Sequence, residues 1–338
     1  MNYIGSKYSL LDFIDTTIEN VVGENLSELT FCDIFAGTGI VGRHFKTKVR
    51  KVISNDWEYY SYALNKNYIG NHKDIADKEG YIKKLNLLNG VENGFIYTQY
   101  CLGGGNERQY FSDENGKKID AIRLQIEAWK NDGQITENLY YFLLCSLIES
   151  ADKYANTASV YGAFLKNLKK SAQKPLVITP ANFQLNHNEH EVYNEDANEL
   201  IKKIEGDILY LDPPYNSRQY GANYHMLNTI AEYKSFTPKG KTGLREYKRS
   251  RYCSKASVKA SFEELIRDSK FKYVILSYNN EGIMSIETIR DIMSKYGQYQ
   301  VFKKEHQRFR ADKPENRNYS TNSTIEYLHV LTKNNIKQ

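Results

Sequence analysis

The sequence predicts an α/β fold in which a mostly parallel sheet ends in an antiparallel hairpin and is interrupted by a mainly helical insert. Three observations predict it. Short apolar runs alternate with helical patterns at both ends of the chain, residues 71–189 lack this alternation, and no helix separates the last two apolar runs. We therefore expect two domains. Residues 1–70 and 190–338 would form the sheet domain, and residues 71–189 would form the insert.

The first part of the chain predicts three helices and two strands in alternation. Apolar residues recur at helical spacing over residues 10–21, and the apolar run at 30–35 then predicts a strand that ends in glycines. Residues 40–45 predict a second helix, residues 51–54 a second strand, and residues 59–68 a third helix. A strand–helix–strand unit is the simplest interpretation.

The later elements follow from the same patterns. Within the insert, only two helices are clearly indicated, and the alternation resumes near Glu191. The strongest strand of the chain is stopped by two prolines, which cannot continue a central strand. In chain order the expected elements are helices at 120–131 and 136–150, a weak strand at 192–193, a helix at 198–204, strands at 207–211 and 272–277, a helix at 286–296, and strands at 299–304 and 325–332.

Composition limits the classes of function. The 338 residues carry a net charge of +5, with a sequence pI of 8.7, which is too mild for a protein that wraps nucleic acid with its whole surface. The N-terminus has no apolar core of the signal-peptide type, and no run approaches the roughly 20 apolar residues of a membrane span, so we expect a cytoplasmic protein with no membrane contact. The four cysteines lie far apart and the histidines are not clustered, so we expect neither disulfides nor a metal site.

A glycine-containing turn follows the first predicted strand, in the stretch FCDIFAGTGIVGRHF. Gly37 and Gly39 permit a tight turn from strand to helix in which the backbone passes close to a ligand. The stretch is neither GxGxxG nor a GK[ST] phosphate loop, so neither a dinucleotide nor a triphosphate is favoured. Such a turn can also be a simple connection. However, the next strand ends at Asp56, whose carboxylate can accept hydrogen bonds from both ribose hydroxyls. The glycine turn and Asp56 together therefore indicate a cofactor that contains adenosine.

A second stretch, ILYLDPPY, places a carboxylate and two prolines directly after a buried strand. Asp212 follows the strand, Pro213 and Pro214 stiffen the backbone, and Tyr215 supplies an aromatic face. The exocyclic amine of a nucleobase is a poor nucleophile because its lone pair is delocalised into the ring. Two acceptors, the Asp212 carboxylate and the Pro213 carbonyl, would localise that lone pair for attack on a methyl sulfonium, while Tyr215 would stack on the extruded base.

Five stretches occur in a definite order along the chain: NYIGSK, DIFAGTG, Asn55 with Asp56, residues 194–196 (NED), and DPPY. In this order they resemble the amino-directed DNA adenine methyltransferases whose cofactor motif precedes the catalytic motif. The resemblance implies a Rossmann-like methyltransferase sheet, and it implies that the insert at 71–189 is a target-recognition domain. DPPY is the form usual for adenine acceptors, whereas the cytosine amino-methyltransferases more often have serine first.

The resemblance also implies S-adenosylmethionine as the methyl donor. Lys7 would pair with the carboxylate at the methionine end of the donor, near Tyr3. Asp56 would bind the donor's ribose, and Asp196 would accept a hydrogen bond from the donor's adenine amino group. A helix N-cap is the alternative role for Asp196, and a solvated cation is the alternative for Lys7. The implied cofactor-binding residues are Tyr3, Lys7, Asp33, Phe35, Ala36, Gly37, Thr38, Gly39, Asp56 and Asp196, and the implied catalytic residues are Asp212, Pro213, Pro214 and Tyr215.

A basic segment follows the DPPY motif. Between residues 234 and 259 nine lysines and arginines accompany a single acid, Glu246, and two tyrosines lie among them. This mixture is expected where phosphates are bound and a base is stacked, although a solvated loop is the alternative. The candidate DNA-binding residues are Arg245, Lys248, Arg249, Arg251 and Lys255.

The function expected from these residues is site-specific methylation of the adenine amino group in double-stranded DNA. The enzyme would belong to a restriction-modification system, in which an endonuclease that acts on the same site would be its partner. Two alternatives stay open: methylation of adenine in structured RNA by the same pocket, and a nucleic-acid-binding module without turnover. Asp212 could act as a base or only as a hydrogen-bond acceptor.

Overall fold

The computed structural model describes residues 6–307 and 323–334, and the chain forms two compact units. We call them the sheet unit and the helical unit. The described parts of the sheet unit are Ser6–Trp57, Asn188–Gln219, and residues 249–307 and 323–334. The described parts of the helical unit are Glu58–His187 and Tyr220–Lys248. The helical unit therefore starts earlier than the expected insert, and it also contains a segment that lies after the DPPY motif.

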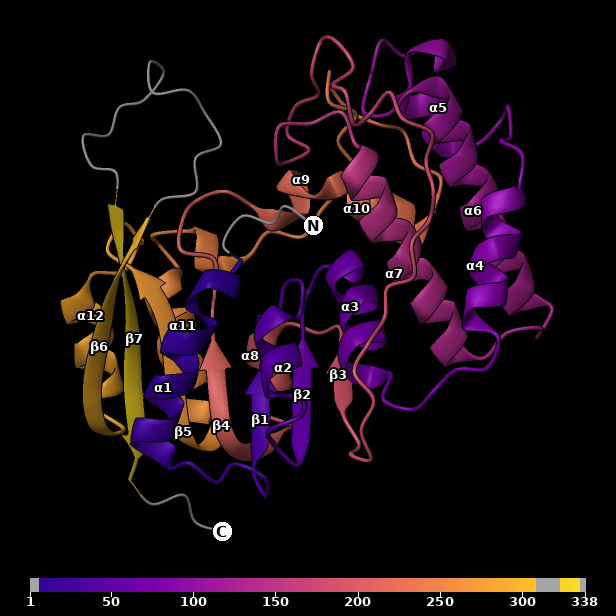
Figure 1. Cartoon of the computed structure of the whole chain (residues 1–338). Coiled ribbons are helices and arrows are strands. Elements are labelled where there is room, and N and C mark those ends of the chain that lie inside the picture. Colours follow the sequence, from indigo (N-terminus) through magenta and orange to yellow (C-terminus); the bar gives the residue numbers. More distant parts are fainter. Residues whose placement is uncertain (1–5, 308–322, 335–338) are drawn as a thin grey trace. The chain divides into compact units, whose positions relative to one another are not determined.

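The sheet unit is built on a seven-stranded sheet within the described residues (Figure 1). The strand order is β3-β2-β1-β4-β5-β7-β6, the first five of these strands run parallel, and β7 is antiparallel to both of its neighbours. The expected mostly parallel sheet with an antiparallel final hairpin is confirmed. The strands are β1 (Thr30–Asp33), β2 (Lys51–Asn55), β3 (Glu191–Tyr193), β4 (Glu205–Leu211), β5 (Lys270–Asn279), β6 (Gly297–Gln307) and β7 (Ser323–Lys333).

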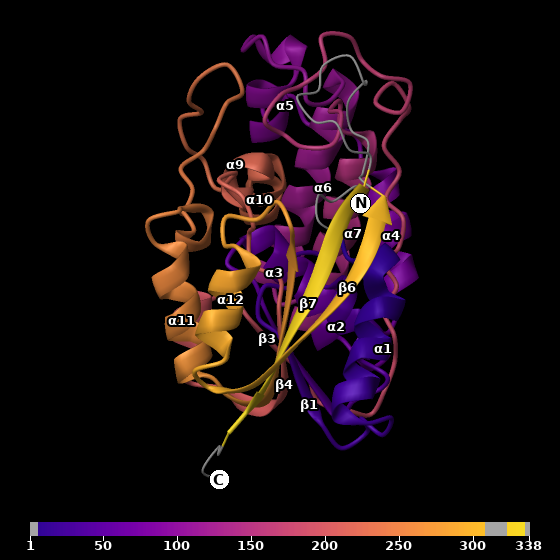
Figure 2. The same cartoon turned by 90° about the vertical axis from the view of Figure 1, so that its left-hand side faces the viewer.

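Helices cover both faces of this sheet, as Figure 2 shows with the sheet nearly edge-on. One face carries α1 (Leu11–Val22) and α2 (Ile40–Phe45), and the other carries α11 (Val258–Asp268) and α12 (Ile286–Met293), with the short α8 (Ala197–Leu200) in the same apolar cluster. The central strands are buried on both sides because helices cover both faces, which explains their continuous apolar runs.

Aromatic packing fixes α2 against the sheet. Phe31 of β1 is fully buried and stacks on Phe45 of α2, with ring centroids 4.4 Å apart. The ring of Tyr210 of β4 lies 6.2 Å from that of Phe31 on the same face. These contacts hold the helix that follows the glycine turn close to the two central strands.

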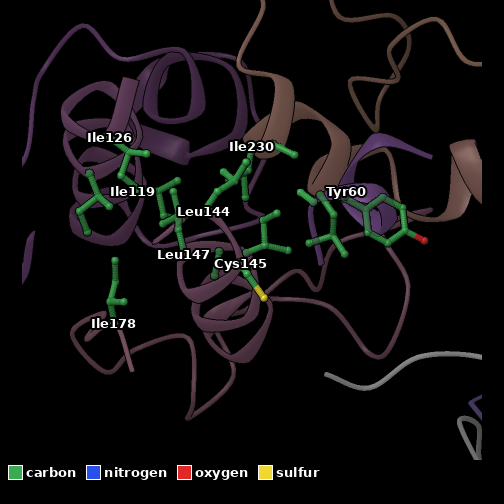
Figure 3. Packing of buried hydrophobic residues seen from close by; sticks show 14 of the residues in the cluster. Tyr60, Ile119, Ile126, Leu144, Cys145, Leu147, Ile178 and Ile230 are labelled. Carbon is green, nitrogen blue, oxygen red and sulfur yellow. The ribbon is translucent and has the colours of Figure 1, made fainter. Parts of the chain in front are cut away.

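The helical unit is assembled around α7 (Glu137–Tyr154). Figure 3 shows Leu144 and Leu147 of α7 facing Ile119 and Ile126 of α6 (Asp113–Asn131), with Ile230 of α10 (His225–Glu232) close by. The other helices of this unit are α3 (Tyr59–Asn65), which continues as a π-helical turn over Lys66–Gly70, α4 (Lys78–Leu87), α5 (Phe95–Tyr100), α6 (Asp113–Asn131), α9 (Tyr220–Asn223) and α10 (His225–Glu232).

Buried arginine side chains explain why residues 220–248 belong to the helical unit. Arg123 of α6 is 3% exposed and donates hydrogen bonds to the carbonyls of Ile230 and Ala231 near the end of α10, both at 3.1 Å. Arg108 donates in the same way to the carbonyls of Gly240 and Lys241. A buried guanidinium must have its donors satisfied, so these contacts fasten the segment to the insert.

Of the two helices expected in the insert, α6 begins earlier than apolar spacing predicts, and α7 begins close to the predicted position. α6 starts at Asp113 instead of 120, because its first two turns are polar and its N-terminus is capped by the Ser112 hydroxyl, which accepts from Asn115 N–H at 3.3 Å. Thr136 caps α7 in the same way. Across the described residues, no helix combines the length and the apolarity that a membrane crossing requires.

Candidate active site

The ends of adjacent parallel strands bring the candidate residues together in the sheet unit. β1 pairs with β2 and with β4, so that Asp33 lies opposite Ser54 on one side and Tyr210 on the other. Asp56 and Asp212 then follow β2 and β4 at the same edge. Burial raises the pKa of Asp33 well above its ordinary value, and the negative charges of Asp212 and Asp56 raise it further. The three carboxyl groups therefore form one electrostatically coupled cluster.

The glycine turn after β1 has the backbone conformation that its sequence predicts. Gly37 and Gly39 have φ angles of +52° and +75°, in the left-handed region that residues with a Cβ rarely adopt. The N–H of Gly37 donates to a carboxylate oxygen of Asp56 at 2.8 Å, and the N–H of Ala36 donates to the Asn55 carbonyl at 2.9 Å. The carboxylate after β2 thus fixes the turn after β1.

Asn55 ties three strand ends together. Its side chain is almost fully buried, and its amide donates to the carbonyls of Ile34 (3.0 Å) and Glu195 (3.2 Å). Its side-chain oxygen accepts the N–H of Glu195 at 3.0 Å, and Asn194 donates to the Asp56 carbonyl at 2.7 Å. The segments after β1, β2 and β3 are therefore held in one arrangement. The sequence marks Asn55 as part of a motif but does not indicate this role.

A buried lysine contacts the carboxylate of the DPPY motif. The Lys7 ammonium lies 3.1 Å from Asp212 Oδ1 and 3.3 Å from Glu326 Oε1, and only 6% of the lysine side chain is exposed. Burial opposes the charge on Lys7, but the two carboxylates outweigh it and raise the pKa of Lys7 above its ordinary value. Lys7 was expected to pair with the carboxylate of a methyl donor. In this structure two side-chain carboxylates hold its ammonium.

The environment of Asp212 sets its protonation. The pKa of Asp212 is raised to about 6, because burial and, to a smaller extent, the Glu326 carboxylate outweigh the lowering by the Lys7 ammonium. Tyr215 of the same motif is partly buried, and its carbonyl accepts the N–H of Ile283 at 3.0 Å. The backbone of the motif is thereby fixed on the segment between β5 and α12. The arrangement can present a carboxylate that is ionised near neutral pH and can still accept a proton.

Comparison with known proteins assigns the family. Residues 3–292 match the model of the D12 class N6 adenine-specific DNA methyltransferases. The chain belongs to this family. Its function as a site-specific adenine DNA methyltransferase, expected from the motifs, is confirmed.

Several type II methyltransferases are similar to this chain over most of its length. It is 63% identical to M.NlaIII of Neisseria lactamica, over 98% of this chain and 99% of that protein. It is 39% identical to M.CviAII of Paramecium bursaria Chlorella virus 1, over 92% of this chain and 93% of that protein. M.FokI of Planomicrobium okeanokoites is 40% identical over 92% of this chain, which spans 50% of that protein.

The remaining cofactor candidates of the methyltransferase occupy different environments. Phe35 makes an edge contact with Tyr252, with ring centroids 5.0 Å apart, and Thr38 is partly buried in the glycine turn. Asp196 caps α8, because its Oδ1 accepts the N–H of Asn198 at 2.9 Å. The alternative considered for Asp196, a helix cap, is therefore present. Tyr3 lies outside the described residues.

The basic segment of the methyltransferase is divided between the two units. Arg245 and Lys248 belong to the helical unit, where Arg245 pairs with Glu232. The other three candidates, Arg249, Arg251 and Lys255, belong to the sheet unit.

These three cations of the sheet unit differ in their surroundings. Arg251 lies 3.4 Å from Glu264 and 3.5 Å from Asp196, whereas Arg249 and Lys255 are exposed. No local pattern in the sequence predicts the pairing of Arg251 with these two carboxylates, because Glu264 lies on a different helix. Among the described residues, no group of three histidine, cysteine or acidic side chains could hold a metal ion.

Replacement of Asn55 tests whether its side chain holds the strand ends. In Asn55→Ala the buried carbonyl of Ile34 and the partly buried N–H and carbonyl of Glu195 lose their hydrogen bonds to this side chain, and we expect the free energy of unfolding to fall by about 1–3 kcal/mol. Urea unfolding followed by circular dichroism measures this. Asn131→Ala, at an exposed position of α6, should stay within about 0.5 kcal/mol. Equal losses in the two variants would contradict the role of Asn55.

Proposed function

We propose that this methyltransferase uses S-adenosylmethionine to methylate N6 of an adenine extruded from double-stranded DNA, with Asp212 as the acceptor for the adenine amino group. One observation carries the proposal. Asp212 follows the central strand β4 at the edge where the glycine turn and Asp56 also lie, and a buried ammonium accompanies it. A carboxylate next to a glycine turn at the carboxyl ends of parallel strands is where α/β enzymes bind a nucleotide-like ligand beside their reacting groups.

The residues of the glycine turn fit a ligand that contains adenosine. Gly37 and Gly39 would let the backbone approach such a ligand closely, because they carry no side chain and adopt a conformation that other residues rarely adopt. Asp56 would accept from the ribose hydroxyls, and Asp196 from the adenine amino group of the donor. Asp33, Phe35, Ala36 and Thr38 would form the wall of the same site, with Tyr3 and Lys7 toward the methionine end. The donor supplies an electrophilic methyl group on a sulfonium.

The acceptor residues make the adenine amine nucleophilic. One N–H of the amine would donate to the Asp212 carboxylate and the other to the Pro213 carbonyl, which favours a tetrahedral nitrogen with a localised lone pair. Pro214 keeps this backbone stiff, and Tyr215 would stack on the extruded base. Because the pKa of Asp212 is raised to about 6, the carboxylate is ionised at pH 7 and is basic enough to receive the amine's proton.

The helical unit and the basic segment would bind the duplex. We propose that the helical unit, which contains most of the expected insert at 71–189, recognises the target sequence. The exposed Arg249 and Lys255 would contact phosphates, as would Lys248, whereas Arg245 and Arg251 are already paired with acids. A restriction endonuclease that recognises the same site would be the partner of this enzyme, in keeping with the type II naming of its relatives.

Asp212→Ala tests the acceptor role. We expect methyl transfer to duplex DNA to fall by about three orders of magnitude or more, because the variant loses both an acceptor for the amine and the group that takes its proton. The affinity for S-adenosylmethionine should change little. Incorporation of labelled methyl groups and calorimetric titration measure the two quantities. Asp291→Ala, at an exposed position of α12, is the control, and near-normal turnover in Asp212→Ala would refute the assignment.

Two substitutions of Asp56 separate ribose binding from support of the turn. Asp56→Ala should weaken S-adenosylmethionine binding by about 1.5–3 kcal/mol, the range for a hydrogen bond to a charged group. Asp56→Asn retains an oxygen that can accept from Gly37 N–H, so it should keep the turn but still lose part of the affinity. Calorimetric titration measures both. Unchanged affinity in the two variants would place the ribose elsewhere.

Neutralisation of Arg249 and Lys255 tests the phosphate contacts. The double variant with glutamine at both positions should bind cognate and scrambled duplexes more weakly, and the salt dependence of log K should flatten by about 0.9 per lost contact. The methylated sequence should not change. Lys270→Gln, at the opposite end of β5 from the strand-end site, is the control. Unchanged slopes and affinities over a salt series would exclude these two cations from DNA binding.

A further inference from the structure

A buried glutamate lies beside the catalytic carboxylate, and neither the expected motifs nor the proposed mechanism assigns it a role. Glu326 belongs to β7, and only 8% of its side chain is exposed. Its Oε1 lies 3.3 Å from the Lys7 ammonium and accepts a hydrogen bond from the Ser277 hydroxyl of β5 at 2.7 Å. Because Lys7 also contacts Asp212, a chain of contacts runs from Ser277 through Glu326 and Lys7 to Asp212.

We propose that Glu326, fixed by Ser277, is a positioning residue for methyl transfer: it holds the Lys7 ammonium and so limits how strongly that ammonium binds Asp212. The inference rests on the proposed role of Asp212 as the acceptor for the adenine amine. It adds a residue that acts on Asp212 through Lys7 without touching the substrate.

The charge count of the cluster argues against a purely structural role. One carboxylate is enough to neutralise Lys7, and a second buried carboxylate costs desolvation energy. With the carboxyl groups of Asp212 and Glu326 beside one ammonium, acidic groups outnumber basic ones in the cluster. The ammonium divides its attraction between the two carboxylates, so Asp212 is held less firmly than in a simple ion pair.

The geometry leaves Asp212 able to bind its substrate. Lys7 contacts Oδ1 of Asp212, whose side chain is 21% exposed, and Oδ2 of the same carboxylate would accept an N–H of the adenine amine. A free Lys7 could shift fully onto Asp212 and compete with the amine for both oxygens. Glu326 opposes that shift because it attracts the ammonium from the other side, and Ser277 fixes the glutamate.

The antiparallel strand β7 explains how a residue near the C-terminus reaches this site. β7 pairs with β5 so that Glu326 lies opposite Asn279, at the carboxyl end of β5. The N-terminal end of β7 therefore lies at the edge of the sheet where the parallel strands end. A parallel final strand would place its first residues at the far edge of the sheet.

The charged and titratable groups around Asp212 determine the sign of the effect. Lys7 precedes α1, Glu326 is on β7, Tyr210 is on β4, Asp33 ends β1, and Tyr215 follows Asp212 in the motif. Of the charged groups, Lys7 lowers the pKa of Asp212 and Glu326 raises it. Removal of the Glu326 charge therefore lowers that pKa, and removal of the Lys7 charge raises it.

The test is the pH dependence of single-turnover methyl transfer by the full-length enzyme on duplex DNA. In Glu326→Gln we expect the acidic limb of the rate profile to move to lower pH by about half a unit, because a nearby negative charge is lost. The plateau rate should fall about 10-fold, a part of the factor that proton transfer contributes. The KM for S-adenosylmethionine should stay within about 2-fold, since the substitution changes the rate and not donor binding.

Three further variants make the test specific. Glu326→Asp keeps the charge, so its acidic limb should stay closer to that of the wild-type enzyme. Lys7→Met should move the limb in the opposite direction, to higher pH. Glu305→Gln removes an exposed charge from the neighbouring strand β6 and should change neither the limb nor the plateau.

The outcomes separate this inference from the proposed function. A wild-type rate profile in Glu326→Gln, with only lower stability, would overturn the inference while Asp212→Ala remained inactive. High activity in Asp212→Ala would instead refute the proposed function itself. If Glu326→Gln does not fold, Ser277→Ala decides, because it should shift the limb in the same direction by a smaller amount, and an unchanged profile there would overturn the inference.

Discussion

The buried hydrogen bonds of Asn55 are the constraint on which the strand-end site depends. Parallel strands bring their carboxyl ends to one edge of a sheet, but the loops that follow them are free to diverge. Asn55 binds the segments after β1 and β3 through its own side chain, and it stands at the end of β2. The glycine turn, Asp56 and Asp196 take their positions from this tie, and the DPPY motif follows the next strand of the sheet.

The second constraint is the charge balance among Lys7, Asp212 and Glu326. Asp212 follows β4, which lies on the opposite side of β1 from β2. Two carboxylates compensate the burial of the Lys7 ammonium, and that ammonium in turn favours the ionised form of the partly buried Asp212. The carboxylate that we propose as the acceptor is therefore part of a cluster whose composition sets its basicity. Family membership assigns the reaction, and the cluster supports the proposed role of Asp212 in it.

The sequence predicted the residues whose signals are local. Asp56 and Asp212 are predicted as site residues because each follows an apolar run, and the glycine turn is predicted because Gly37 and Gly39 come shortly after the end of β1. Glu326 and Ser277 were missed because their pairing depends on the register of β7 against β5, which no local pattern specifies. The attachment of residues 220–248 to the helical unit was missed for the same reason, since it rests on buried contacts of Arg108 and Arg123.

A crystal structure of the enzyme with duplex DNA and S-adenosylhomocysteine, the product form of the donor, would show which groups bind the adenine amine. We expect N6 of the extruded adenine to lie about 2.7–3.2 Å from both an Asp212 carboxylate oxygen and the Pro213 carbonyl, with Tyr215 on the face of the base. The cofactor's ribose should lie on Asp56. An adenine amine bonded to other groups, with Asp212 turned toward the cofactor or toward Lys7 through both oxygens, would contradict this expectation.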